Sequence, residues 1–268
     1  MRPSRIAARL CSLLTAVCTL TATPVAHAAP RGYATGYVAL GDSYSAGVGA
    51  GSYLTSSTDC LRSSHSFPAL WAAAHAPSSF DFTACNGARA LDVLSRQLGS
   101  LNARTGLVTI TVGGSDAGFS HVMTTCVLHG SGTCLDAVKE ALDRIDSALP
   151  GDLDRLYAAI RAKAPHAHVV VLGYPHLYQL NGSCKAGLAD TTRSALNGAV
   201  DRLDKVIDER ATHHGFTYVD VTGAFTGHEI CSSAPWLHSV NWLAPTESYH
   251  PTEKGQSQAY LPALNRTA

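Results

Sequence analysis

A serine near the start of the chain and a histidine near its end have the residue types of a nucleophile and its base. Ser43 completes a Gly-Asp-Ser segment that follows a short apolar run at residues 37–40, and His250 lies in a late Glu-Ser-Tyr-His-Pro segment. A serine hydroxyl is a weak nucleophile at neutral pH unless a histidine within hydrogen-bond reach accepts its proton. The two residues can meet only in a fold that places the first strand beside the last loop.

Ser43 also has a simpler interpretation, as the N-cap of a helix that follows the strand. The glycine and aspartate before it favour the catalytic interpretation, because a tight turn exposes the hydroxyl. The G-x-S-x-G elbow of α/β-hydrolases is absent, since Ser45 stands where that motif has its second glycine. Ser45 is the weaker candidate for the nucleophile.

His250 differs from the other histidines because Pro251 follows it. A residue before proline is held extended, which fixes the backbone of a base. Glu247 lies three residues earlier, and in a turn its carboxylate is able to accept from the other ring nitrogen and hold the tautomer. An ordinary solvated loop acid is an equally good interpretation of Glu247.

Short β-rich runs alternate with helical stretches along the rest of the chain. Apolar runs without alternation indicate strands buried on both faces, and interleaved helices indicate a parallel sheet. We therefore expect an α/β fold, a three-layer α/β/α sandwich. The predicted strands cover residues 37–40, 80–84, 107–112, 168–172 and 217–221. The predicted helices cover residues 67–75, 90–98, 117–127, 134–149, 150–164, 192–214 and 251–264.

Glycine-bearing turns follow the first four predicted strands, at the sheet edge where sites of such folds lie. Gly87 and Gly114 have a simple interpretation as turn residues that need positive φ. Their functional interpretation is that backbone N–H groups there point at a developing oxyanion. Ser115 is placed to donate its hydroxyl to the same oxyanion, and we expect Asp116 to cap the helix that begins near residue 117.

The first 28 residues are typical of a secretory signal peptide, and residues 29–268 are expected to form one domain. Three arginines precede a mostly apolar stretch at residues 10–20, and Ala-His-Ala at residues 26–28 forms a small-x-small cleavage site. No later stretch has the length and apolarity of a transmembrane helix. We expect a secreted, extracellular protein without a stable membrane anchor, and nothing in the sequence suggests more than a monomer.

The charge balance argues against two classes of partner. Removal of the signal arginines leaves 17 basic residues against 20 acidic ones, a net charge of −3 with histidine neutral. Nucleic-acid binding usually needs a basic face, and electrostatic binding to a membrane surface needs a polybasic patch. Neither is expected here.

Six cysteines remain after residue 28, and an even number in an exported chain indicates disulfides rather than a metal site. Six cysteines allow 15 pairings. Two histidine pairs, at residues 166 and 168 and at residues 213 and 214, look like metal ligands at first. No acid stands nearby at a fitting spacing, so we interpret both pairs as surface or strand-edge residues and expect no metal.

Together these motifs resemble the secreted GDSL, or SGNH, esterases and lipases of actinomycetes. The resemblance covers nearly all of residues 29–268, and the combination of motifs is highly specific. The segments that carry it are YVALGDSYSAG at 37–47, FTACNGA at 82–88, ITVGGSDAGF at 110–119, CSSAPWLH at 231–238 and SYHP at 248–251.

The resemblance implies a flavodoxin-like parallel sheet and a secreted serine esterase or lipase that hydrolyses carboxylic esters of acyl lipids or small molecules, without a metal or organic cofactor. It implies Ser43 as nucleophile and His250 as general base and later general acid. The backbone amides of Ser43 and Gly87 would form the oxyanion hole. It also implies the sequential disulfide pairing that we favour, Cys60–Cys85, Cys126–Cys134 and Cys184–Cys231.

The third block departs from the family pattern, which usually reads Gly-Gly-Asn-Asp and uses the asparagine amide as a third oxyanion donor. This chain has Ser115 there, whose hydroxyl is shorter and rotates, and it has Asn86 beside Gly87 where a small residue is usual. Our hypothesis is that Asn86 and Ser115 exchange roles, with Asn86 supplying the amide from the other side of the hole.

A second departure concerns the residue three before His250, which is commonly aspartate in the family and is Glu247 here. Some secreted relatives orient the histidine with a backbone carbonyl two residues before it, which in this chain is the carbonyl of Ser248. We keep Glu247 and the Ser248 carbonyl as rival orienting groups.

Other functions remain open. Ser115 makes a weakly active or inactive binding protein on an SGNH scaffold one alternative, and an acyltransferase, a phospholipase A-type enzyme or a polysaccharide deacetylase is another. We expect the loops at residues 53–66 and 226–244 to shape an acyl groove, with Trp236, Leu237 and Trp242 as apolar contacts. Packing of these side chains around a disulfide is an equally good interpretation.

Overall fold

A five-stranded parallel sheet forms the centre of the protein, in a computed structural model that describes residues 35–57, 59–184 and 187–268. The expected signal peptide lies outside these residues. The strand order is β2-β1-β3-β4-β5, the flavodoxin-like order, so the α/β expectation is confirmed. The strands are β1 Gly36–Gly41, β2 Ser79–Phe82, β3 Thr105–Thr111, β4 His168–Leu172 and β5 Thr217–Val219.

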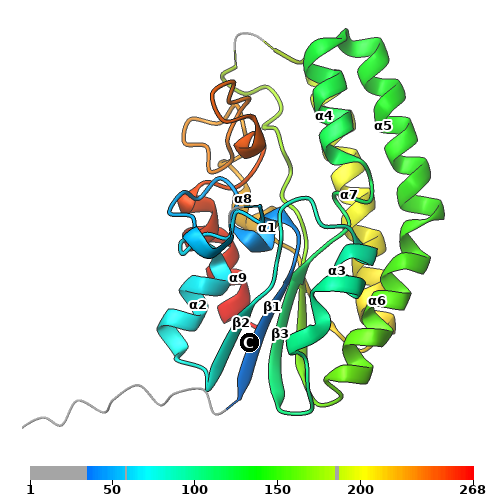
Figure 1. The fold of residues 1–268 in the computed structure, drawn as a ribbon. Helices are drawn as coiled ribbons and strands as arrows, with labels where there is room; N and C mark the ends of the chain where they lie inside the picture. Colours follow the sequence, from blue (N-terminus) through cyan, green and yellow to red (C-terminus); the bar gives the residue numbers. More distant parts are fainter. Residues whose placement is uncertain (1–34, 58, 185–186) are drawn as a thin grey trace, which may run out of the picture.

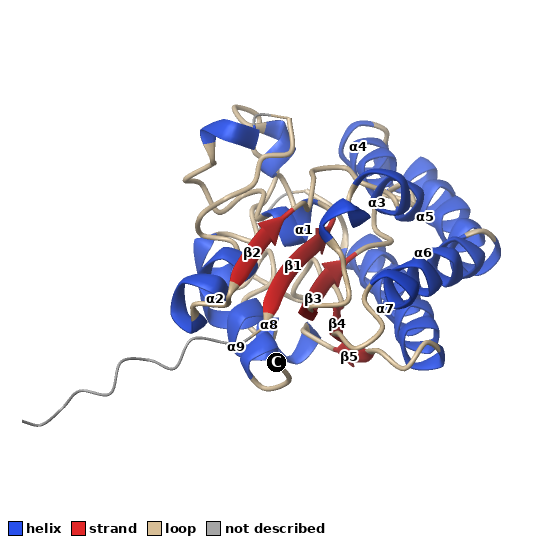
Figure 2. Ribbon diagram, turned by 60° about the horizontal axis from the view of Figure 1, so that its bottom comes forward, coloured by secondary structure: helices blue, strands red, loops and turns tan. Residues whose placement is uncertain are grey.

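Helices cover both faces of the sheet (Figures 1 and 2). The principal ones are α2 Phe67–His75, α3 Ala90–Arg96, α4 Phe119–Leu128, α5 Gly130–Ser147, α6 Leu149–Lys163 and α7 Asp190–His213. Shorter ones are α1 Ser43–Ala46, α8 Thr222–Phe225, a π-helical segment Gly255–Tyr260 and α9 Leu261–Asn265. On one face α2 packs with α8, α9 and the π-helical segment, and on the other α3, α6 and α7 pack together with α5 outside them.

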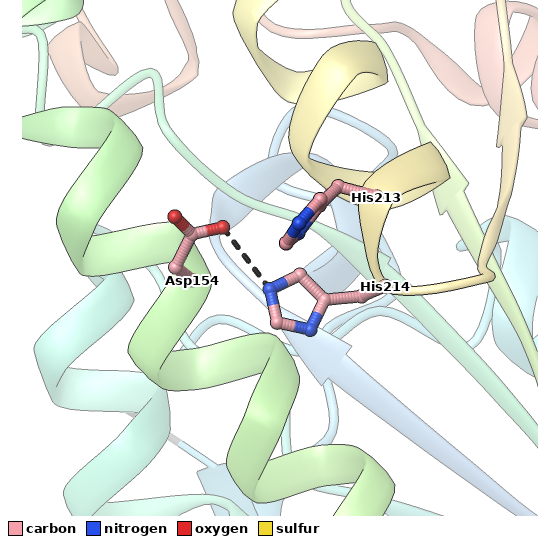
Figure 3. A group of neighbouring side chains, drawn as sticks. All are labelled: Asp154, His213 and His214. Atoms are coloured by element: carbon pink, nitrogen blue, oxygen red, sulfur yellow. Dashed lines mark hydrogen bonds and ion pairs between the residues drawn. The ribbon is translucent and has the colours of Figure 1, made fainter.

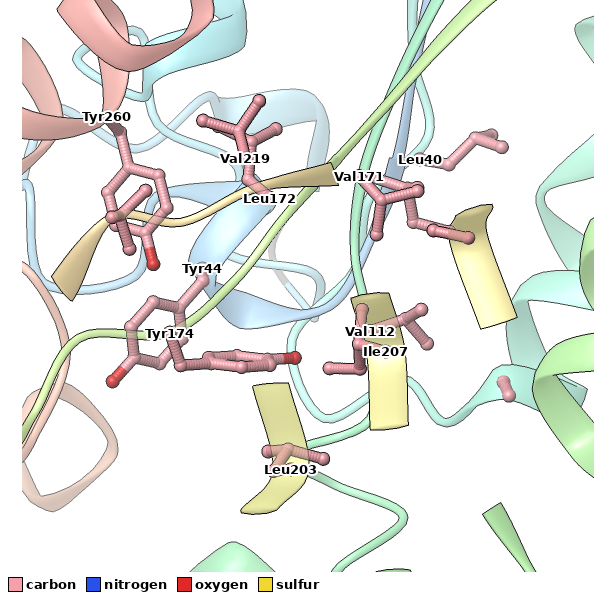
Figure 4. Close-up of a cluster of buried hydrophobic side chains, with 14 of the residues drawn as sticks. Leu40, Tyr44, Val112, Val171, Leu172, Tyr174, Leu203, Ile207, Val219 and Tyr260 are labelled. Atoms are coloured by element: carbon pink, nitrogen blue, oxygen red, sulfur yellow. The ribbon is translucent and has the colours of Figure 1, made fainter. Parts of the chain in front are cut away.

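The central strands are almost wholly buried because helices cover them on both sides. Leu203 and Ile207, one turn apart on α7, pack into the same core as Val112 and Tyr174, which follow β3 and β4 (Figure 4). This contact fixes α7 against the ends of two strands. It therefore also fixes the turns that those strands enter.

Two details of the sequence prediction are wrong. The last helix was expected to open at Pro251, but Pro251 pairs with Leu237 in an isolated antiparallel bridge, and the helical residues begin at Glu253. Asp116 was expected to cap α4. Its carboxylate instead accepts from the backbone N–H of Ala90 at 3.1 Å, so it satisfies the first turn of α3.

The described residues contain three disulfides, of which two anchor loops and the third, Cys126–Cys134, joins α4 to α5. Their pairing is the sequential one that the family resemblance implies, Cys60–Cys85, Cys126–Cys134 and Cys184–Cys231. Among the described residues, no helix has both the length and the apolarity to cross a membrane.

Gly41 ends β1 at a position that excludes any side chain. Its φ is +122°, and an added Cβ would lie 2.3 Å from the carbonyl oxygen of Thr111 on the neighbouring strand. Both the backbone conformation and the close approach therefore require glycine.

We predict that Gly41→Ala lowers the free energy of unfolding by at least about 2 kcal/mol, because a strained backbone and a clash against the sheet act together. Thermal melts followed by circular dichroism measure the change. Gly99→Ala is the matched control, since its Cβ would meet no atom within 4 Å and its φ is not positive. Equal melting temperatures for the two variants would contradict the prediction.

Candidate active site

The turns after β1, β2 and β3 and the last loop of the chain meet at the carboxyl edge of the sheet. Ser43 opens α1 directly after β1, and His250 reaches it from the C-terminal loop, with 2.7 Å between Ser43 Oγ and His250 Nε2. Both side chains are largely buried. The structure thus brings the two predicted residues into a hydrogen bond across 207 positions of sequence.

The loop that carries His250 is tied to α1 by buried hydrogen bonds. The Tyr44 hydroxyl donates to the carbonyl of Tyr249 at 2.8 Å. The side-chain amide of Gln256 donates to the carbonyl of Tyr44 at 3.0 Å and accepts from the N–H of Phe67 at 2.9 Å. Tyr249 has a φ of +67°, a strained conformation that these contacts hold in place. Sequence reasoning did not find Tyr44 or Gln256.

The other ring nitrogen of His250 faces a backbone carbonyl. His250 Nδ1 lies 3.1 Å from the carbonyl oxygen of Ser248, so an N–H at Nδ1 leaves Nε2 free to accept from Ser43. The carboxylate of Glu247 accepts instead from the Tyr53 hydroxyl at 2.8 Å. Between the two rival orienting groups, this geometry favours the Ser248 carbonyl.

Burial is the main influence on the imidazole of His250. Removal of the ring from water lowers its pKa to about 4, although hydrogen bonds to backbone groups, that of Ser248 foremost, raise it. The ring is therefore neutral over most of the acidic range, which is the form that accepts a proton.

A buried carboxylate stands directly behind Ser43. Asp42 accepts from the Thr111 hydroxyl at 2.7 Å, from the N–H of Tyr44 at 3.0 Å and from the Tyr174 hydroxyl. The Tyr174 hydroxyl in turn accepts from the N–H of Gly114 at 3.2 Å. Burial raises the pKa of Asp42 to about 6, while these donors lower it. The network links the ends of β1, β3 and β4 beneath the site.

Comparison with known proteins decides the family. Residues 39–258 match the GDSL-like lipase/acylhydrolase family. The chain belongs to this family. It is 58% identical to "Lipase 1" of Streptomyces coelicolor over 100% of both chains. This GDSL hydrolase is thus a carboxylic ester hydrolase, and the family resemblance seen in its sequence is confirmed.

Two solved structures share the fold. The crystal structure of phospholipase A1 from Streptomyces albidoflavus matches with a TM-score of 0.86 and 58% identity, covering 88% of this chain and 100% of that one. The extracellular lipase from Streptomyces rimosus matches with a TM-score of 0.85 and 55% identity, with the same coverage.

The expected oxyanion donors of the GDSL hydrolase surround one small pocket. Ser43, Asn86, Gly87 and Ser115 line it together with His250. Gly87 has a φ of +73°, as its turn requires. The N–H groups of Ser43 and Gly87 have no hydrogen-bond partner among the described residues, so both are available to an incoming oxygen.

Ser45, the weaker candidate nucleophile, faces away from this pocket. Its side chain is fully buried, and its hydroxyl oxygen accepts from the N–H of Thr111 at 3.0 Å and contacts the Thr111 hydroxyl at 2.9 Å. Ser45 therefore ties α1 to β3 and does not reach a substrate.

A groove of about 380 Å³ extends from the pocket between α4 and the loop before His250. Trp242 lines this groove, as expected. Trp236 and Leu237 do not: Trp236 stacks on His228 with ring centroids 3.5 Å apart, and Leu237 is buried. For these two, the packing interpretation describes the structure better.

One of the two histidine pairs does meet an acid, which sequence spacing could not reveal because the acid comes from another helix. His214 Nε2 lies 3.0 Å from Asp154 Oδ1 on α6, with His213 beside them (Figure 3). Arg210 pairs with the other carboxylate oxygen at 3.5 Å. This cluster joins the end of α7 to α6. It lies near the start of β5, at the amino ends of the strands, whereas Ser43 lies at their carboxyl ends.

Proposed function

We propose that this GDSL hydrolase is exported and cleaves acyl esters of lipids, with Ser43 as nucleophile and His250 as base. The hydrogen bond between Ser43 Oγ and His250 Nε2 carries the proposal. Export is supported by the three disulfides and by the similarity to the extracellular lipase from Streptomyces rimosus.

In the proposed mechanism Ser43 Oγ attacks the ester carbonyl carbon while His250 Nε2 takes its proton. The amides of Ser43 and Gly87 bind the oxyanion of the tetrahedral intermediate. The alcohol leaves with the proton from His250, and an acyl-serine remains. Water then attacks the acyl-serine while His250 Nε2 takes a proton from the water. His250 returns this proton to Ser43 Oγ as the acyl–oxygen bond breaks and the acid is released. The Ser248 carbonyl holds the Nδ1–H of His250 throughout.

The groove beside the pocket suits an acyl chain, because Phe119, Met123, Val127 and Val240 line much of it. The relatives named lipases and the phospholipase A1 support lipid esters as the substrate class. The similarity to the phospholipase A1 also favours phospholipid esters within this substrate class. A disabled binding protein would not need the free Ser43 and Gly87 amides beside a paired serine and histidine.

The central test measures hydrolysis of a p-nitrophenyl ester series by wild-type protein and by Ser43→Ala. We expect activity in the wild type and a loss of at least about 10⁴-fold in the variant, since the nucleophile is gone. Ser45→Ala is the matched control and should retain activity if it stays folded. A folded wild-type protein without activity would favour the binding-protein alternative.

Glu247→Ala should reduce kcat by less than about tenfold, because the Ser248 carbonyl rather than the carboxylate orients His250. Steady-state kinetics on a soluble ester measure this. Tyr53→Phe removes the same Tyr53–Glu247 hydrogen bond and should give a similar value. A loss of about 10³-fold or more in Glu247→Ala alone would indicate a serine–histidine–glutamate triad.

Asn86→Ala should lower kcat by about 10²–10³-fold with little change in KM, as expected when an oxyanion donor is lost. Ser115→Ala should have a smaller effect if Asn86 supplies the amide. Ser115→Asn restores the usual family residue and tests whether a second amide raises kcat. Unchanged turnover in Asn86→Ala would end the role-exchange hypothesis.

The pH profile should extend far into the acidic range. His250 stays neutral until the pH falls to its lowered pKa of about 4. We therefore expect kcat/KM on a soluble ester to fall only below about pH 5.

Circular dichroism at each pH is the necessary control. An unfolded histidine takes up its proton below about pH 6.5, before folded His250 does, so this group reduces folding stability as the pH falls through that window. An acidic limb near pH 6.5 in folded protein would contradict the prediction.

A further inference from the structure

Apolar side chains stand exposed to solvent at the mouth of the groove. Leu243 is 99% exposed, Trp242 70% and Leu128 59%. Trp242 and Leu128 both line the groove, although one comes from the loop before His250 and the other from the end of α4. Leu243 directly follows Trp242 in the same loop. Single exposed apolar residues are ordinary, but two on one groove with a third beside them in sequence mark an interaction surface.

The loop that presents Trp242 and Leu243 is ordered by its own hydrogen bonds. The side-chain oxygen of Asn241 accepts from the N–H groups of Leu243 and Ala244 at 3.1 and 3.2 Å. The N–H of Asn241 donates to the Ser248 hydroxyl at 2.8 Å. Ser248 also supplies the carbonyl next to His250 Nδ1, so the same residue contacts both the loop that carries Trp242 and the histidine of the site.

Charge indicates which partner this surface fits. Among the residues that the structure describes, no Asp, Glu, Lys or Arg lines the groove, and burial keeps His250, which does line it, neutral above about pH 4. Anionic membranes attract clusters of Lys and Arg, and the described lining of this groove contains none. A surface of zwitterionic lipid needs only apolar side chains that insert, with tryptophan at the headgroup level.

We propose that Trp242, Leu243 and Leu128 insert into a zwitterionic lipid surface and hold the groove over it. The inference rests on the proposed lipid-ester hydrolysis and adds the site by which the protein adsorbs to its aggregated substrate. An ester then passes from the lipid surface into the groove without crossing water.

The test compares sedimentation of Ser43→Ala protein of residues 29–268, the expected exported form, with phosphatidylcholine vesicles, with and without a second change at Leu243. Ser43→Ala prevents hydrolysis during the measurement. Leu243→Ser should weaken binding about tenfold, because burial of one leucine side chain contributes a free energy that corresponds to about that change in affinity. Leu243→Phe should keep the binding. Leu91→Ser is the matched control, since Leu91 is an exposed leucine on α3, which packs against α6, and it does not line the groove.

A kinetic comparison separates this inference from the proposed function. With Ser43 intact, Leu243→Ser should hydrolyse soluble p-nitrophenyl acetate as the wild type does, yet lose most of its rate on phosphatidylcholine vesicles. Equal rates on vesicles, or no sedimentation of the Ser43→Ala protein with them, would overturn docking while the ester hydrolysis stands. No hydrolysis of the soluble ester by the wild type would overturn the proposed function itself.

Two further results would assign the surface to another partner and so overturn the inference. One is self-association in analytical ultracentrifugation that Leu243→Ser abolishes, which would make the surface a contact between two copies. The other is binding to anionic vesicles that is far stronger than binding to phosphatidylcholine and falls with salt, which would place the contact on basic residues elsewhere.

Discussion

The hydrogen bond between Ser43 and His250 is the constraint that the rest of the structure must satisfy. It joins the first turn of the described fold to its last loop, so it forms only when β1 lies inside the sheet and the C-terminal segment returns across its carboxyl edge. Tyr44 and Gln256 make the same connection with buried hydrogen bonds. Several contacts, each modest in net energy, together fix two groups that must meet within a few tenths of an ångström.

Asp42 shows how the site is supported from below. A buried carboxylate is costly unless donors surround it. Here Tyr44 supplies one from the helix that Asp42 caps, and Thr111 and Tyr174 supply the others from the ends of β3 and β4. Displacement of any one segment would leave a buried charge with fewer partners. The carboxylate therefore couples the position of Ser43 to that of Gly114, whose N–H donates to Tyr174. Tyr174 is one of several residues that line the pocket, and its hydroxyl also holds Asp42 in place.

The sequence predicted the sheet and the residues of the pocket, because strand patterns and turn motifs are local properties. The predicted strand at residues 168–172 and helix at residues 67–75 agree with β4 and α2 at both ends. The failures concern partners far apart in sequence. Asp116 caps a helix 26 residues earlier, and Asp154 meets a histidine 60 residues later. Local rules left Glu247 and the Ser248 carbonyl as rivals, and the contact that separates them comes from Tyr53, 194 residues away, whose hydroxyl donates to the Glu247 carboxylate.

A neutral carbonyl as the partner of His250 suits the electrostatics of this pocket. Asp42 already places one carboxyl group beneath Ser43, and a second carboxylate against the imidazole would also have to be desolvated. The carbonyl of Ser248 fixes the ring and its tautomer without an added charge. It stabilises an imidazolium less than a carboxylate does, which agrees with the lowered pKa of His250. The proposed base thus stays neutral in acid, and in the proposed mechanism more of the charge stabilisation in the transition state falls to the oxyanion donors around Gly87.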